Sequence, residues 1–186
     1  MAKTKPWHQV IRLREDIRSG ELSQKEFAAD LYDVMMDRNR SVYHDPKQFF
    51  ELTYPTTRLR ELARDVVLTL AGKSEKAVRQ LQLTYGGGKT HALITLVHLV
   101  SDPANLPKLA AIEEFVSHIG ITPPKARVAA LGFDRLDVET GMDVRAPDGK
   151  MRRFKMPWSA LAWQLGGEEG LKVLGGGNKE RETPPA

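Results

Sequence analysis

Apolar residues recur at helical spacing through most of the first seventy positions. From residue 27 to 35 they return every three or four positions, and Ser23 with Glu26 forms a capping box before them. A second helix is predicted to begin at Asp45–Pro46, and a third to span 57–71 with a stop at Gly72. Together they predict a small helical layer. The apolar residues ahead of it are expected to contact the core: Trp7, Val10, Ile11 and Leu13.

The pattern changes after residue 76. Residues 77–83 alternate polar and apolar and are followed by glycines, which is typical of a strand. Residues 90–101 are apolar on nearly all sides, as in a buried helix, and another helix follows from Asn105. The continuous apolar run 128–133 is typical of a strand buried on both faces of a parallel sheet. Strand, helices and strand in this order form a right-handed crossover.

These elements predict an α/β fold that is a partial P-loop NTPase, with a strand, a phosphate loop and a helix on a parallel sheet, preceded by the helical layer. A hairpin is expected around the turn 146–149, and a short helix over 157–165. We divide the chain into an N-terminal helical region, 1–75, the first part of a P-loop NTPase core, 76–174, and a linker or disordered tail, 175–186.

Composition narrows the class of protein. The 186 residues suffice for one ordinary domain, and 41% of them are hydrophobic, enough to bury a core. No stretch approaches the ~18 apolar residues of a membrane span, and the N-terminus lacks the apolar core of a secretory signal. The chain has no cysteine, which excludes disulfides, thiolate metal sites and cysteine nucleophiles. We expect a cytoplasmic protein without membrane partners.

The distribution of charge leaves one alternative function open. The net charge is +4, but basic and acidic residues are interleaved, which favours a solvated surface. The basic string KMRRFK, residues 150–155, permits phosphate contacts on the hairpin. A nucleic-acid-binding module therefore stays open beside an ordinary solvated hairpin.

The glycine-rich stretch between the predicted strand and helix carries the main chemistry. Gly86, Gly87 and Gly88 allow backbone amides to converge on an anion where a helix begins. Lys89 is placed to reach the β- and γ-phosphates of a nucleotide, and Thr90 to bind Mg²⁺. The stretch therefore predicts a site for ATP and Mg²⁺. The strict phosphate-loop pattern is not met, because its first glycine would fall at Leu83.

Hydrolysis requires further groups that the sequence does not clearly supply. A second acidic residue usually follows a strand of four apolar residues as Asp-Glu, and no such string exists here. Asp134, after the apolar run 128–133, is either a metal-shell ligand or a residue that caps a turn. His91 either contacts a phosphate-bound water or is an ordinary helix-start histidine. Catalytic residues stay unassigned, and ATPase activity by this chain alone stays open.

The string LQLTYGGGKTHALITLVHL, residues 81–99, resembles the glycine loop of a family of large bacterial and archaeal AAA+-like ATPases, catalogued as domain of unknown function 499. Further likeness lies in PWHQVIRL, FAADL, HDPKQFFELTYPTTRL, PPKARVAAL, APDGK and WSALAWQLGGEEG, so it covers nearly the whole chain. Members are often encoded beside DNA methyltransferases and helicases in anti-phage loci. The resemblance implies that Gly86 to Thr90, with His91, bind ATP and Mg²⁺, Thr90 contacting the metal.

In that family this region begins a much longer protein, and the remaining catalytic elements come later. The end in ETPPA resembles a truncation, so we expect a fragment. The resemblance implies an ATP-binding part of an anti-phage AAA+-like ATPase, with DNA as a possible partner through the full-length protein or an associated methyltransferase or helicase. A truncated, non-catalytic interaction module is the alternative. Oligomers are possible.

Overall fold

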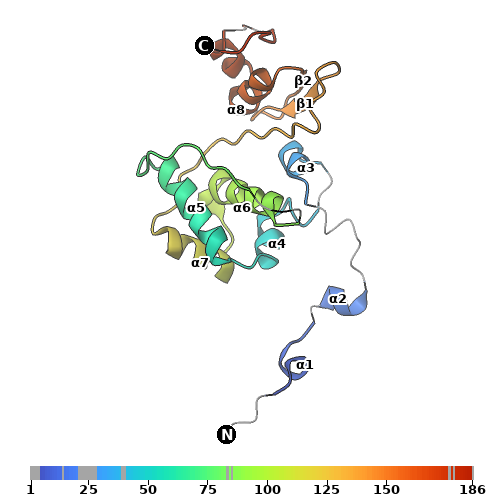
Figure 1. The fold of residues 1–186 in the computed structure, drawn as a ribbon, viewed down its shortest axis with the longest axis vertical. Helices are drawn as coiled ribbons and strands as arrows, with labels where there is room; N and C mark the ends of the chain where they lie inside the picture. Colours follow the sequence, from blue (N-terminus) through green and yellow to red (C-terminus); the bar gives the residue numbers. More distant parts are fainter. Residues whose placement is uncertain are drawn as a thin grey trace.

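The computed structural model describes residues 5–13, 15–20, 29–38, 41–82, 84, 86–175, 177 and 179–185. The capping box of Ser23 and Glu26, and Leu83, lie outside these residues. Figure 1 shows two lobes joined by α3, with an N-terminal arm reaching away from them. The elements, in chain order, are α1 (Trp7–Val10), α2 (Glu15–Ser19), α3 (Leu31–Met36), α4 (Pro46–Glu51), α5 (Thr57–Leu70), α6 (Lys89–Ser101), the 3₁₀ helix η2 (Pro103–Asn105), α7 (Ala110–Ile119), β1 (Met142–Arg145), β2 (Met151–Phe154) and α8 (Pro157–Val173).

The first lobe is a helical cluster of α4, α5, α6 and α7. The Asp45 carboxylate caps α4 by accepting from the Gln48 amide at 2.9 Å, and Thr56 caps α5 by accepting from the Leu59 amide at 3.3 Å. Their apolar faces form one core, which contains Phe49, Phe50, Ala63, Val67, Ile94, Leu99, Val100, Ile112, Phe115 and Ile119. The predicted helix start at Asp45–Pro46 and the predicted helix 57–71 are confirmed.

The second lobe packs α8 on a β-hairpin. β1 and β2 pair antiparallel, with Met142 opposite Phe154 and Arg145 opposite Met151, so the predicted hairpin is confirmed. The turn closes through the Ala146 amide, which donates to the Lys150 carbonyl at 2.9 Å. A second buried cluster results, containing Met142, Val144, Ala146, Phe154, Ala160, Trp163 and Leu171.

Helix α3 touches both lobes. Its Leu31 and Val34 pack against the first core, while Tyr32 packs against the second. The Tyr32 hydroxyl donates to the backbone carbonyl of Asp143 on β1 at 2.9 Å. An ion pair of 3.1 Å between Asp37, just after α3, and Arg145 adds a further link. The six residues of α3 therefore tie the helical cluster to the hairpin.

The prediction of a parallel sheet, and with it an α/β P-loop NTPase fold, is wrong. In the part of the chain that the structure describes, the sheet consists of β1 and β2 alone, and the rest is mostly helical. Neither 77–82 nor 128–133 forms a strand. The alternation in 77–82 does not mark a buried face, because Val78 is 80% exposed.

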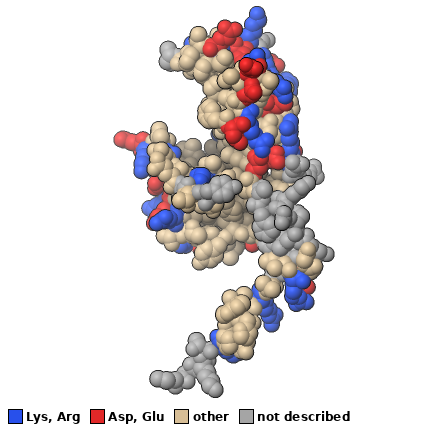
Figure 2. All heavy atoms as spheres, turned by 45° about the vertical axis from the view of Figure 1, so that its right-hand side comes forward, with Lys and Arg blue, Asp and Glu red and all other residues tan. Residues whose placement is uncertain are grey.

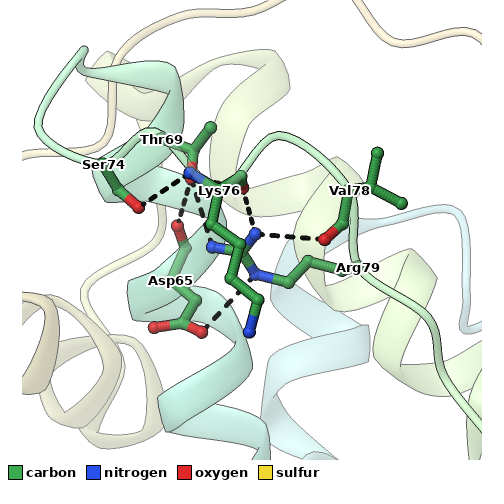
Figure 3. Close-up of polar contacts among 6 residues, drawn as sticks. All are labelled: Asp65, Thr69, Ser74, Lys76, Val78 and Arg79. Carbon is green, nitrogen blue, oxygen red and sulfur yellow. Dashed lines mark hydrogen bonds and ion pairs between the residues drawn. The ribbon is translucent and has the colours of Figure 1, made fainter.

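The first of these segments, 77–82, is held by the side chain of Arg79 and not by a neighbouring strand. Figure 3 shows Arg79 turned back onto the C-terminal end of α5. Its guanidinium donates to the Lys76 carbonyl and to the Thr69 hydroxyl, the latter at 3.3 Å, and lies 3.5 Å from the Asp65 carboxylate. Segment 76–79, which leads toward the glycine loop, is thereby held on α5.

At the second segment, 128–133, the side-chain amide of Gln164 binds the backbone where a neighbouring strand was expected. Gln164 of α8 is buried, and its amide nitrogen donates to the Ala130 carbonyl at 2.9 Å while its oxygen accepts from the Ala130 amide at 3.1 Å. Nearby, the Ala126 amide donates to the backbone carbonyl of Val100, near the end of α6, at 2.8 Å. The backbone groups of Ala130 are therefore paired without a strand partner.

The N-terminal arm differs from its expected role. Residues Trp7, Val10, Ile11 and Leu13 were predicted to contact the core, yet each is 60–73% exposed. Figure 1 shows α1 and α2 projecting from the lobes, which explains this exposure. None of the described helices has the length and apolar content needed to cross a membrane.

Candidate functional site

The glycine loop leads directly into α6. Gly86 and Gly88 have φ angles of 77° and 79°, in the left-handed region that glycine adopts without strain. The Gly87 amide donates to the Thr84 carbonyl at 3.0 Å and closes a turn. Gly88 is the N-cap of α6 and supplies no side-chain acceptor, so the first amides of a 13-residue helix open onto the loop. Such an end attracts anions through its amides and its dipole.

Lys89 and Thr90 begin this helix, and their side chains have different surroundings. The exposed Lys89 side chain folds back over the turn, and its Nζ donates to the Thr84 carbonyl at 3.1 Å. Thr90 is half-buried and lines a cavity of about 340 Å³. Among loop residues 86–90, Thr90 is the one on the cavity wall.

Three elements enclose this cavity. The N-terminal end of α3 forms one wall, the first turns of α6 another, and segment 130–135 the third. Its polar lining consists of Asp30, Tyr32, Thr90, Asp134 and Arg135. A volume of this size lies at the lower end of the range for small-molecule sites. Larger hollows exist on α8 and between α5 and α7, but neither contains a glycine loop.

The cavity brings together two residues that sequence reasoning treated separately. Thr90 and Asp134 both line it, although 44 positions separate them in the chain. Asp134 is exposed and lies within a turn that closes where the Arg135 amide donates to the Gly132 carbonyl at 3.0 Å. Among the described residues we find no cluster of three His, Asp or Glu side chains that could hold a metal by itself.

Asp30 and Arg135 are cavity residues that sequence reasoning missed. Their side chains form an ion pair, and the Arg135 guanidinium lies 5.0 Å from the centre of the Tyr32 ring. Asp30 precedes α3 and caps it, which a helix-start pattern could have indicated. No sequence signal places it beside segment 130–135, because 105 positions separate the two charges.

The His91 side chain contacts α4 and Thr53, two residues beyond its end. Its ring lies 4.6 Å from the Phe49 ring, and its Nε2 lies 3.1 Å from the Thr53 hydroxyl oxygen. That hydroxyl donates its one hydrogen to the Phe49 carbonyl at 2.7 Å, so it accepts from His91 and Nε2 carries a proton. His91 therefore holds the first turn of α6 against α4.

His98, two turns further along α6, is buried against the same aromatic cluster. Its Nε2 donates to the Tyr43 carbonyl at 2.8 Å, and its ring lies 5.1 Å from that of Phe49. Burial lowers the pKa of both His91 and His98, and for His98 the bond to Tyr43 opposes this in part. Both imidazoles are thus favoured in the neutral form when the chain is folded.

We expect the chain to lose stability as the pH falls below about 6.5, the ordinary histidine pKa. The unfolded chain then binds more protons than the folded one, so the free energy of unfolding decreases with acidification. The slope is at most about 1.4 kcal/mol per pH unit for each histidine, and less for His91 because solvent screens it. Urea titrations between pH 7.5 and 5 measure this, above the range in which carboxylates titrate.

The matched control for this pH dependence is His8→Gln, which removes an exposed histidine of the arm and should leave the slope unchanged. His98→Gln should reduce the slope. A free energy of unfolding that stays constant from pH 7.5 to 5 would contradict the assigned neutral histidines.

The basic hairpin is largely neutralised by its own neighbours. Arg153 makes two bonds of 2.8 Å to the Asp143 carboxylate, and Lys150 lies 3.2 Å from Asp148. Arg152 lies over the Trp163 ring at 5.5 Å. Figure 2 shows acidic and basic side chains interleaved over this lobe. The arrangement favours a solvated hairpin over a nucleic-acid surface.

Comparison with protein-family models gives a match to the DUF499 N-terminal domain over residues 4–169. Neither a curated protein sequence nor a solved structure matches the chain. The matched region contains the arm, the first buried core, the second core apart from Leu171, the glycine loop and the cavity beside it. The family resemblance expected from the sequence is confirmed, and the chain belongs to the DUF499 family.

Proposed function

We propose that the glycine loop and the first turn of α6 bind the phosphates of ATP together with Mg²⁺. The observation that carries the proposal is the position of the loop. Gly86 and Gly88, in left-handed conformations, lead into an uncapped helix end, and the next residues reach a cavity that contains Asp134. Anion binding at a helix end depends on local amides and the dipole. It does not require a parallel sheet.

Each residue has a stated part in the proposal. Lys89 exchanges the Thr84 carbonyl for a phosphate, which is the stronger partner because both groups are charged. The Thr90 hydroxyl contacts Mg²⁺, and Asp134 across the cavity holds its water shell. His91 keeps the first turn of α6 in position through Thr53 and Phe49. The phosphates themselves supply the remaining metal ligands.

The wider role in the proposal comes from the family. We propose that this domain is the nucleotide-binding part of an AAA+-like ATPase in a prokaryotic DNA-defence system, and that contact with DNA is made by the full-length protein or its partners. Membership of the DUF499 family supports this context. Hydrolysis is not included, because the cavity residues contain no Asp-Glu pair to activate water.

The arm supports a second candidate, an interaction module without catalysis. Its side chains include Trp7, 73% exposed, and Ile11, 60% exposed, within the segment that matches the family domain. Apolar groups presented together in this way are typical of surfaces that bind a partner. This candidate does not involve Lys89, so nucleotide titration separates it from the first.

Millimolar Mg-ATP should raise the melting temperature of the chain, and Lys89→Ala should abolish the rise. Nucleotide at a hundred times its Kd adds about 2.7 kcal/mol, which corresponds to roughly 5–10 °C for a chain of this size. Differential scanning fluorimetry with Mg-ATP, and with Mg²⁺ alone, measures this shift. A wild-type melting temperature that does not respond to Mg-ATP would rule the proposal out.

Lys108→Ala is the matched control. Lys108 is an exposed lysine before α7, outside the loop and the cavity lining. Its loss removes the same charge and should leave the response to Mg-ATP unchanged. An equal loss of response in both variants would indicate nonspecific attraction by net charge.

A further inference from the structure

The cavity beside Thr90 contains one cation whose partners can be exchanged. Arg135 belongs to segment 130–135, which lines the cavity together with α6, and its side chain is 44% exposed. It pairs with Asp30, which is 32% exposed, and lies over the face of Tyr32. Ion pairs this exposed contribute little to stability, so exchange of the partner costs little.

We infer that Arg135 contacts the terminal phosphate of the bound nucleotide and so distinguishes nucleoside triphosphates from diphosphates. This inference rests on the proposed function of the glycine loop. Of loop residues 86–90, Thr90 faces the cavity, so a phosphate chain that lies on the loop enters the cavity with its terminal group. The planar guanidinium of arginine matches the oxygens of a phosphate with two parallel bonds.

Asp30 holds Arg135 in place until the nucleotide arrives. Its Oδ2 pairs with Arg135, whereas its Oδ1 accepts from the amides of Tyr32 and Asp33 at 2.9 and 3.4 Å and caps α3. The two oxygens therefore have separate tasks. Arg135 can leave Oδ2 for a phosphate while α3 stays capped and in contact with both lobes.

Because the two oxygens have separate tasks, one substitution can weaken the ion pair with Arg135 and keep the cap of α3. Asp30→Asn keeps a side-chain oxygen that caps a helix as well as aspartate does. It removes the negative charge that competes with phosphate for Arg135. Under the proposal, Asp30→Asn binds ATP more tightly than the wild type, by a factor of up to about ten. Affinity for ADP stays unchanged because ADP does not reach Arg135.

The decisive experiment is isothermal titration of the full chain with Mg-ATP and with Mg-ADP. Arg135→Gln should lower the affinity for ATP by about tenfold or more and leave that for ADP within about twofold. Arg135→Lys keeps the charge but loses the planar fork, so its ATP affinity should be intermediate. Arg12→Gln removes an equal charge from the exposed arm and should change neither affinity.

The outcomes separate the two proposals. If the wild type binds neither nucleotide, the proposed function and this inference both fail. If Lys89→Ala abolishes binding while Arg135→Gln lowers the affinities for ATP and ADP equally, or changes neither, the inference about Arg135 alone is overturned. Melting temperatures without nucleotide show that each variant is folded, and Arg135→Lys takes the place of Arg135→Gln if the latter is not.

Discussion

Phe115→Ala is expected to remove about 3–5 kcal/mol from the free energy of unfolding. Phe115 lies on α7 in the centre of the helical lobe and has no exposed surface. Its ring lies 5.9 Å from the Phe50 ring, edge to face, so the substitution deletes both apolar burial and an aromatic contact. The neighbouring helices cannot fully close the resulting cavity. Equilibrium unfolding in urea, followed by circular dichroism, measures the loss.

Phe133→Ala provides the comparison for this substitution. Phe133 is the same residue type, but 73% of it is exposed. Its truncation should change the free energy of unfolding by no more than about 0.5 kcal/mol. Similar losses for the two variants would mean that the core of the helical lobe is not centred on Phe115. If the domain lies at the lower end of the typical stability range of about 5–15 kcal/mol, this loss leaves the Phe115 variant close to unfolding.

Gly170→Ala is expected to destabilise the hairpin lobe by about 3 kcal/mol. The chain bends within α8 at Gly167, which has a φ of 57° and a ψ of −133°. Beyond the bend the second half returns against the first, and a Cβ at Gly170 would overlap the backbone carbonyl of Ala162. Because the obstacle is backbone, rotation of a side chain cannot relieve it. Tryptophan fluorescence of α8 during urea unfolding measures the effect.

Gly166→Ala makes the same chemical change four residues earlier. No atom lies within 4 Å of a Cβ at Gly166, and its φ is not in the left-handed region. This substitution should be neutral or stabilise the chain by up to about 1 kcal/mol, because alanine restricts the unfolded chain. Equal destabilisation by both substitutions would show that the return of α8 on itself is not the cause.

Local signals in the sequence were sufficient for α4, α5, α6 and the hairpin, whereas α3 begins only at Leu31 behind an Asp30 cap, and α7 begins at Ala110 and not at Asn105. Asp45–Pro46 and Gly72 mark a helix start and a helix stop through capping chemistry that involves only nearby residues. The turn 146–149 likewise fixes the hairpin by itself. The start of α6 at the glycine loop was also predicted correctly.

The parallel sheet was predicted wrongly because strand patterns do not specify what pairs with the backbone. Residues 128–133 have the composition of a buried strand, yet Gln164, 34 positions after Ala130, binds both of that residue's backbone groups. Of the candidate site, the loop and Thr90 could be identified from sequence. Asp30 and Arg135 could not, since their proximity depends on how α3 packs between the lobes.

The bond between Gln164 and Ala130 also bears on aggregation. The string VAALGF, residues 128–133, is uncharged, apolar and free of proline, which is the type of segment that stacks into cross-β fibrils when its backbone is open. In this fold one glutamine from α8 occupies both backbone groups at Ala130, so the segment does not present a free edge at that point. The Gln164 amide thus occupies at Ala130 the two backbone groups that a covering strand would otherwise pair.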